Sequence, residues 1–136
     1  MNGAGVPSAS VYKRSYLIPP VGYSLLYPEF GLHLAGDGAL GFTITNVSQF
    51  KNGGFPSAGF MAWTGTGVQG PIQVPGPGVA SDDGFTGCTP AGVGRWGDYG
   101  AAVVDATTGF VYTANENISG VRASVSNWGT FMAQLH

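Results

Sequence analysis

The densest group of chemically useful side chains lies between positions 95 and 99, where Arg95, Trp96, Asp98 and Tyr99 are close neighbours in the chain. An aromatic ring has an apolar face and a polar edge, so Trp96 and Tyr99 could stack on a sugar ring. Arg95 and Asp98 could contact the same ligand. They could equally form an ion pair that fixes the start of a strand, and the sequence leaves both interpretations open.

Two further residues extend this candidate site. Trp128 is another indole that could stack on a sugar or pack between neighbouring sheets. Glu116 could form a carboxylate pair with Asp98, an arrangement that glycoside hydrolysis uses, but the sequence does not fix their separation. No catalytic residue and no metal ligand is assigned. The candidate ligand-binding residues are therefore Arg95, Trp96, Asp98, Tyr99, Glu116 and Trp128.

The scarcity of charge, cysteine and histidine argues against several other kinds of site. One cysteine, Cys88, cannot form an intrachain disulfide, and with two histidines it is too little for a zinc site. The acidic stretch 82–84 is interpreted as a solvated turn rather than a calcium site. Five basic and seven acidic residues give a net charge of −2, and no basic cluster extends beyond Lys13-Arg14. We therefore expect no cofactor and no nucleic-acid partner.

Composition also predicts the elements that must position these residues. Of 136 residues, 24 are glycine and 9 are proline, while 43% are apolar and only 9% are charged. Glycine and proline between short apolar runs are typical of an all-β protein with many turns. Alternation is clearest where Leu40, Phe42 and Ile44 share one face of a strand and Thr43 and Thr45 share the other.

The predicted strands lie at 11–18, 25–34, 39–46 and 57–64, within 94–105, and at 110–114 and 128–135. In the second of them Phe30, Leu32 and Leu34 alternate with small or polar neighbours, which predicts one buried face. Residues 65–94 are predicted to be mostly loop around a short run at 72–74. No segment has the periodicity and caps of an amphipathic helix. No apolar run reaches the roughly 18 residues that a membrane span needs, so no membrane partner is expected.

An internal repeat divides the chain. Aromatic-bearing segments at 30–34, 42–46 and 60–62 align with segments at 99–103, 112–116 and 131–133, at offsets of about 69, 70 and 71. Repeats of three or four strands are typical of β-propeller blades. The predicted divisions are a lead-in with a first strand (1–20), a blade-like repeat (21–75), a glycine- and proline-rich loop (76–94) and a second blade-like repeat (95–136).

The predicted fold class is therefore all-β and antiparallel with two β-propeller-blade-like repeats, and a β-sandwich is the alternative. Two blades are too few to close a ring, because propellers typically have about four to eight. The chain could be the tail of a longer propeller, or copies could assemble, for example three into a six-bladed ring. We expect either self-association, with a trimer as one form, or contact with the missing blades of a longer chain.

The stretch Gly94-Arg95-Trp96-Gly97-Asp98-Tyr99, followed by an alanine-rich strand and then Ala114-Asn115-Glu116, carries a family resemblance. With Asp83–Gly87 and Asn127–Thr130, it resembles the C-terminal blades of secreted bacterial sialidase-like (BNR/Asp-box-like) β-propeller proteins. The resemblance implies a propeller blade fold and says little about activity. The arginine trio of true sialidases cannot be mapped, because Arg14, Arg95 and Arg122 are the only arginines, so sialidase chemistry is not expected.

From these observations we expect a non-catalytic β-propeller-type binding or structural module, with carbohydrate as the candidate ligand. The alternative is a fragment of a glycoside-hydrolase-like, sialidase-like propeller enzyme. The expected location is extracellular or in the cell envelope, although the chain as given begins with no secretion signal. The triplet Asn117-Ile118-Ser119 matches the glycosylation acceptor pattern.

Overall fold

The described residues form seven strands and no helix. A computed structural model describes residues 8–11, 14–46, 54–67, 69–82, 96–97, 99–121 and 127–136. The strands are β1 (Tyr23–Leu32), β2 (Gly38–Asn46), β3 (Ser57–Trp63), β4 (Gln69–Gly76), β5 (Ala101–Val104), β6 (Val111–Asn117) and β7 (Gly129–Leu135). None of the elements in these ranges is a helix that could span a membrane.

The strands build two antiparallel sheets in which sequence neighbours pair. Sheet A has the order β1-β2-β3-β4, and sheet B has the order β5-β6-β7. Every pairing is antiparallel, so the predicted all-β, antiparallel class is confirmed. β4 contains Pro71 and Pro75, and it pairs with β3 through two register shifts. Proline donates no ladder hydrogen bond, which suits this strand to the edge of its sheet.

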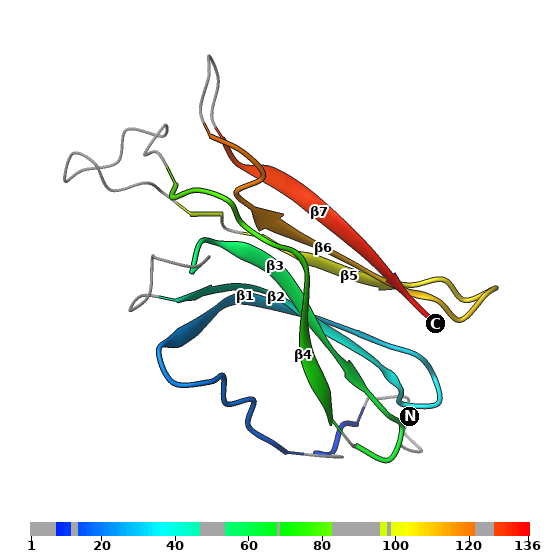
Figure 1. Cartoon of the computed structure of the whole chain (residues 1–136). Coiled ribbons are helices and arrows are strands. Elements are labelled where there is room, and N and C mark those ends of the chain that lie inside the picture. Colours follow the sequence, from blue (N-terminus) through cyan, green and yellow to red (C-terminus); the bar gives the residue numbers. More distant parts are fainter. Residues whose placement is uncertain are drawn as a thin grey trace.

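The two sheets are stacked, and the corresponding strands run in the same direction (Figure 1). The β1–β2 turn lies beside the β5–β6 turn, because a side chain at Gly109 would lie 3.9 Å from His33 Nε2. At the other end of the stack the Ile118 amide donates to the Pro56 carbonyl at 3.0 Å. Between these ends a side chain at Gly31 of β1 would touch Ala102 of β5 and Val111 of β6.

We call the face of each sheet that meets the other sheet its inner face, and the opposite one its outer face. The main apolar core lies on the outer face of sheet A, where Phe42, Ile44 and Met61 form a buried cluster. Their β2 neighbours Ala39, Gly41 and Thr43 are buried on the inner face. The alternation predicted for 40–45 is thus correct, but the apolar side of β2 faces away from sheet B.

An N-terminal strap, residues 14–20, runs along the outer face of sheet A on the side away from sheet B (Figure 1). Leu17 packs against the buried cluster, and Gln69 Nε2 donates to Ser15 Oγ at 2.9 Å. The strand predicted at 11–18 is wrong for residues 14–18, which pair with no other strand, while Tyr12 and Lys13 lie outside the described residues. The strap is held by side chains instead of a ladder.

Three further predictions need correction. The run predicted at 72–74 is part of the longer strand β4, because edge pairing with β3 tolerates its prolines. β6 continues to Asn117, three residues beyond the predicted end, since Glu116 and Asn117 pair with β7. Phe30 and Leu32 are half exposed and Leu34 is fully exposed, so that face is not buried. The cause is that Phe30 and Leu32 lie on the outer face and Leu34 lies in the turn.

Candidate functional site

The described residues of the sequence-predicted site lie at one end of sheet B. Asn117, the last residue of β6, pairs with Gly129, which places Trp128 just beyond that pair. The Gly97 amide donates to Glu116 Oε2 at 2.9 Å, which holds the segment before β5 against the same end of β6. Residues far apart in the chain are thus brought to one end of the sheet, namely Trp96, Gly97, Tyr99, Glu116 and Trp128.

The aromatic members of this group differ in exposure. Tyr99 is 87% exposed and Trp128 is 48% exposed, so both rings are open to a ligand. Trp96 is mostly covered, and its buried Nε1 has no acceptor among the described residues. Burying an unpaired indole N–H costs free energy. The Trp96 ring is therefore held more tightly in place than the exposed rings of Tyr99 and Trp128. Arg95 and Asp98 lie outside the described residues.

Among the described residues, a backbone amide holds the Glu116 side chain in place. Its carboxylate accepts the Gly97 amide, and a side chain at position 97 would collide with that carboxylate. A larger residue at 97 would therefore force the Glu116 carboxylate to move. The Glu116 carbonyl also accepts the Thr43 hydroxyl at 3.1 Å, so the residue connects the two sheets.

A second carboxyl group, Glu29, was not singled out by the sequence. The β1–β2 register shifts between Leu26 and Glu29, and within this bulge Tyr27 has a φ of 49°. A bulge adds a residue to one strand and redirects the side chains that follow. Leu25 pairs with Ile44 on the outer face, and without the bulge Glu29 would face that way too. With the bulge, Glu29 pairs with Gly41 and points between the sheets.

The Glu29 carboxyl group occupies a slot made by the absence of two side chains. A Cβ on Gly41 of sheet A or on Gly100 just before β5 would overlap the carboxyl oxygens. Both oxygens are buried, and neither has a hydrogen bond of good geometry to the part of the chain that the structure describes. Burial raises the pKa of Glu29 from 4.5 to about 7, and the nearby Asn115 amide opposes that rise only in part. The proline after Tyr27 is the signal that could have marked this bulge.

An apolar cavity opens on the outer face of sheet A. Its volume is about 500 Å³, and its walls are formed by the strap on one side and by β1, β2 and β3 on the other. Phe30 and Trp63 meet there edge to face, with ring centroids 5.8 Å apart and an angle of 85°. The lining also includes Leu32, Leu40 and Met61, and none of the described lining residues is charged.

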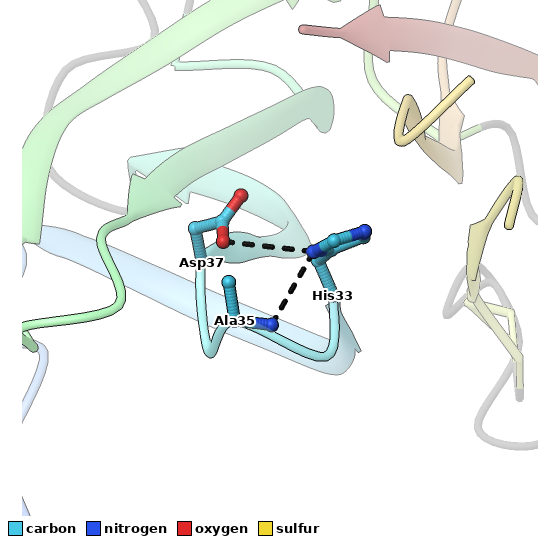
Figure 2. Close-up of polar contacts among 3 residues, drawn as sticks. All are labelled: His33, Ala35 and Asp37. Atoms are coloured by element: carbon cyan, nitrogen blue, oxygen red, sulfur yellow. Dashed lines mark hydrogen bonds and ion pairs between the residues drawn. The ribbon is translucent and has the colours of Figure 1, made fainter. Parts of the chain in front are cut away.

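The β1–β2 turn carries a small polar group (Figure 2). The Ala35 amide donates to His33 Nδ1 at 3.3 Å, and Asp37 Oδ1 lies 3.9 Å from the same nitrogen. The first contact needs an unprotonated Nδ1 and the ion pair needs a protonated one, so the two contacts are alternatives. Both contacts are local to the turn, so we interpret them as stabilising the turn rather than as part of a catalytic group.

Other candidate sites receive little support. Within the described ranges, no three histidine, cysteine or acidic side chains group to hold a metal ion. Asn117 is 6% exposed and its amide donates to the Gly76 carbonyl at 3.4 Å, so this asparagine is not accessible as a glycosylation acceptor. Cys88 lies outside the described residues.

No protein-family model matches the chain, and no curated protein or solved structure is significantly similar to it. Function must therefore be inferred from the geometry of the sheets and of the residues they position.

Proposed function

We propose that the chain is a non-catalytic, β-propeller-type structural and binding module whose two sheets act as stacked blades. The observation that carries this proposal is where the large apolar side chains lie. In a β-sandwich they fill the space between the sheets. Here that space holds Gly41, Thr43 and the Glu29 carboxyl group beside Phe60, while the fully buried Phe42 and Met61 lie on an outer face.

Strand order and direction support the same proposal. Each sheet is a meander of consecutive strands, and β1 and β2 are stacked on β5 and β6 with the same direction. Neighbouring blades of a propeller are arranged in this way, and each blade needs neighbours to cover its faces. The module would therefore associate with further sheets, either in other copies or in a longer chain.

Light scattering coupled to size exclusion tests this proposal. We expect a mass at least twice the 13.9 kDa of one chain, with three chains as the mass of a six-sheet ring. A monomer at all concentrations up to about 100 µM would contradict self-association. The missing-blade form would then require that the chain bind a longer version of itself.

Carbohydrate is the ligand that we propose for the open end of sheet B. The exposed Tyr99 and Trp128 rings favour it, because they lie at the same end of the sheet and each offers a face for stacking. A glycan array with wild type, Trp128→Ala and Tyr99→Ala tests it. We expect binding that both variants lose at unchanged thermal stability, with Tyr16→Ala, an exposed ring on the strap, as the matched control.

The alternative, a fragment of a glycoside hydrolase, has weaker support. Glu116 already accepts a backbone amide, and its proposed partner Asp98 lies outside the described residues. Glu29 has the raised pKa of a general acid, but its oxygens are buried between the sheets. Hydrolysis of aryl glycosides that disappears in Glu116→Gln would favour the enzyme.

A further inference from the structure

Both outer faces of the molecule carry exposed apolar side chains. On sheet B the outer face presents Val103, which is 60% exposed, and Met132, which is 76% exposed. On sheet A it presents Phe30 and Leu32, each 47% exposed, beside the cavity of about 500 Å³. Exposed apolar patches of this kind mark interaction surfaces.

The strand registers show how the two sheets are related. At the turn ends, Gly38 pairs with Trp63 in sheet A, and Val111 pairs with Leu135 in sheet B. Matching these pairs gives offsets of 73 positions for β2 and β6 and 72 for β3 and β7. The offset of 72 for β3 and β7 differs from the 71 that aligned Phe60 with Phe131 by sequence. A shift of one residue exchanges the two faces of a strand.

With the structural offsets, the inner face of sheet A corresponds to the outer face of sheet B. Phe60 pairs with Gly41 on the inner face, and its counterpart Met132 pairs with Ala114 on the outer face. Likewise the outer Trp63 corresponds to Leu135, which lies on the inner face of sheet B. The movement that superimposes sheet A on sheet B therefore does not turn the sheet over. Applied once more, the same movement would place the sheet A of another copy against the outer face of sheet B.

We propose that copies of this chain associate head to tail, with the outer face of sheet B of one copy seated on the outer face of sheet A of the next. This inference rests on the proposed function and names its interface. Met132 and Val103 are the side chains that would enter the cavity beside Phe30, Leu32 and Trp63. Methionine suits this role because its flexible side chain fills irregular apolar gaps.

A second copy is the favoured occupant because one chain carries both surfaces, and because the movement that superimposes sheet A on sheet B would bring them together in the next copy. The strap keeps the same pattern, since Leu17 faces the core while Tyr16 and Ile18 are exposed on its far side, where a next copy would lie. The described lining of the sheet A cavity carries no charge that would oppose the entry of an apolar side chain. A head-to-tail contact of this kind closes into a ring when its rotation allows.

Two variants that each block one face test the direction of assembly. Leu32→Arg places a charge on the outer face of sheet A, and Met132→Arg places one on the outer face of sheet B. Both positions are exposed, so the fold should tolerate them. Each variant alone should be a monomer, because every contact in a head-to-tail assembly needs both faces. Leu34→Arg, in the fully exposed turn, is the matched control and should assemble as wild type does.

Mixing the two variants gives the decisive result. Leu32→Arg keeps a free sheet B face and Met132→Arg keeps a free sheet A face. An equimolar mixture should form a 1:1 complex of twice the 13.9 kDa chain mass that grows no further. Like-to-like pairing would instead leave one single variant dimeric and give no new complex on mixing, which overturns the head-to-tail inference while leaving self-association intact. A monomeric wild type overturns both.

Discussion

The buried carboxyl group between the sheets should make stability depend on pH through one residue. Because the folded-state pKa of Glu29 is about 7 against a model value of 4.5, the folded chain keeps this proton in a range where the unfolded chain has lost it. Stability is therefore undiminished below pH 4.5, falls as the pH rises from 4.5 to about 7, and stays lowered above that. Glu29→Gln, which cannot ionise, should remove the fall.

The size of the effect follows from the same shift. A rise of the pKa from 4.5 to about 7 corresponds to about 3 kcal/mol, at about 1.36 kcal/mol for each tenfold change in acidity. Although both carboxyl oxygens are buried, the rest of the Glu29 residue is partly exposed, so water screens part of the penalty and we expect about 1.5 kcal/mol. For a chain of this size that is a shift of about 1 M in the urea midpoint.

The assay is urea unfolding at pH 4, 5, 6, 7 and 8 and at one fixed protein concentration, because association also stabilises. At pH 8 Glu29→Gln should be more stable than wild type, and at pH 4 the two should agree. Glu116→Gln is the matched control, since its carboxylate accepts an amide, and it should keep the wild-type fall. Asp98→Asn is measured in parallel. If wild type and Glu29→Gln decline together, or if Asp98→Asn removes the fall, Glu29 is not the group responsible.

Three other predictions concern the packing of the sheets and the hydrogen bonds of one turn. Phe42→Ala should cost about 3–5 kcal/mol in urea unfolding, because Phe42 is fully buried. Gly41→Ala should cost more than about 2 kcal/mol, since the new methyl group needs the space of the Glu29 carboxyl, whereas Gly120→Ala, with nothing within 4 Å, should change little. Turn hydrogen bonds lower the pKa of Asp105 from 3.8, so wild type should lose stability relative to Asp105→Asn as the pH falls below 3.8, and equal slopes would contradict this.

The antiparallel all-β class could be predicted because local patterns determine it. The alternation of Leu40, Phe42 and Ile44 with threonines requires a strand with two different faces, and the structure has it. Apolar runs bounded by glycine and proline also located β2, β3 and β7 to within a residue or two. What alternation cannot predict is the partner of each face. Burial was expected at Phe30, yet that ring lies on an outer face that sheet B does not cover.

Long-range relations could not be predicted. A single-residue offset decides which face of a strand a side chain occupies. Aligning Phe60 with Phe131 by residue type gave an offset of 71, whereas matching the β2–β3 and β6–β7 registers gives 72 for β3 and β7. Glu29 was missed for a related reason. Only the bulge at Tyr27 turns it inward, and its slot is formed by Gly41 and Gly100, which are distant in the chain.

The inner and outer faces can be separated experimentally because Glu29 and Leu32 lie on opposite faces of the same strand. If the slot around Glu29 is a property of one chain, monomeric Leu32→Arg should keep the fall in stability between pH 4.5 and 7. Introducing Glu29→Gln into that background should then remove it. A monomer without the fall would mean that the stacking of sheets A and B itself requires a neighbouring copy. In that case the pH dependence caused by Glu29 would require assembly. The free energy of unfolding at pH 8 would then rise with protein concentration in the wild type but not in Leu32→Arg.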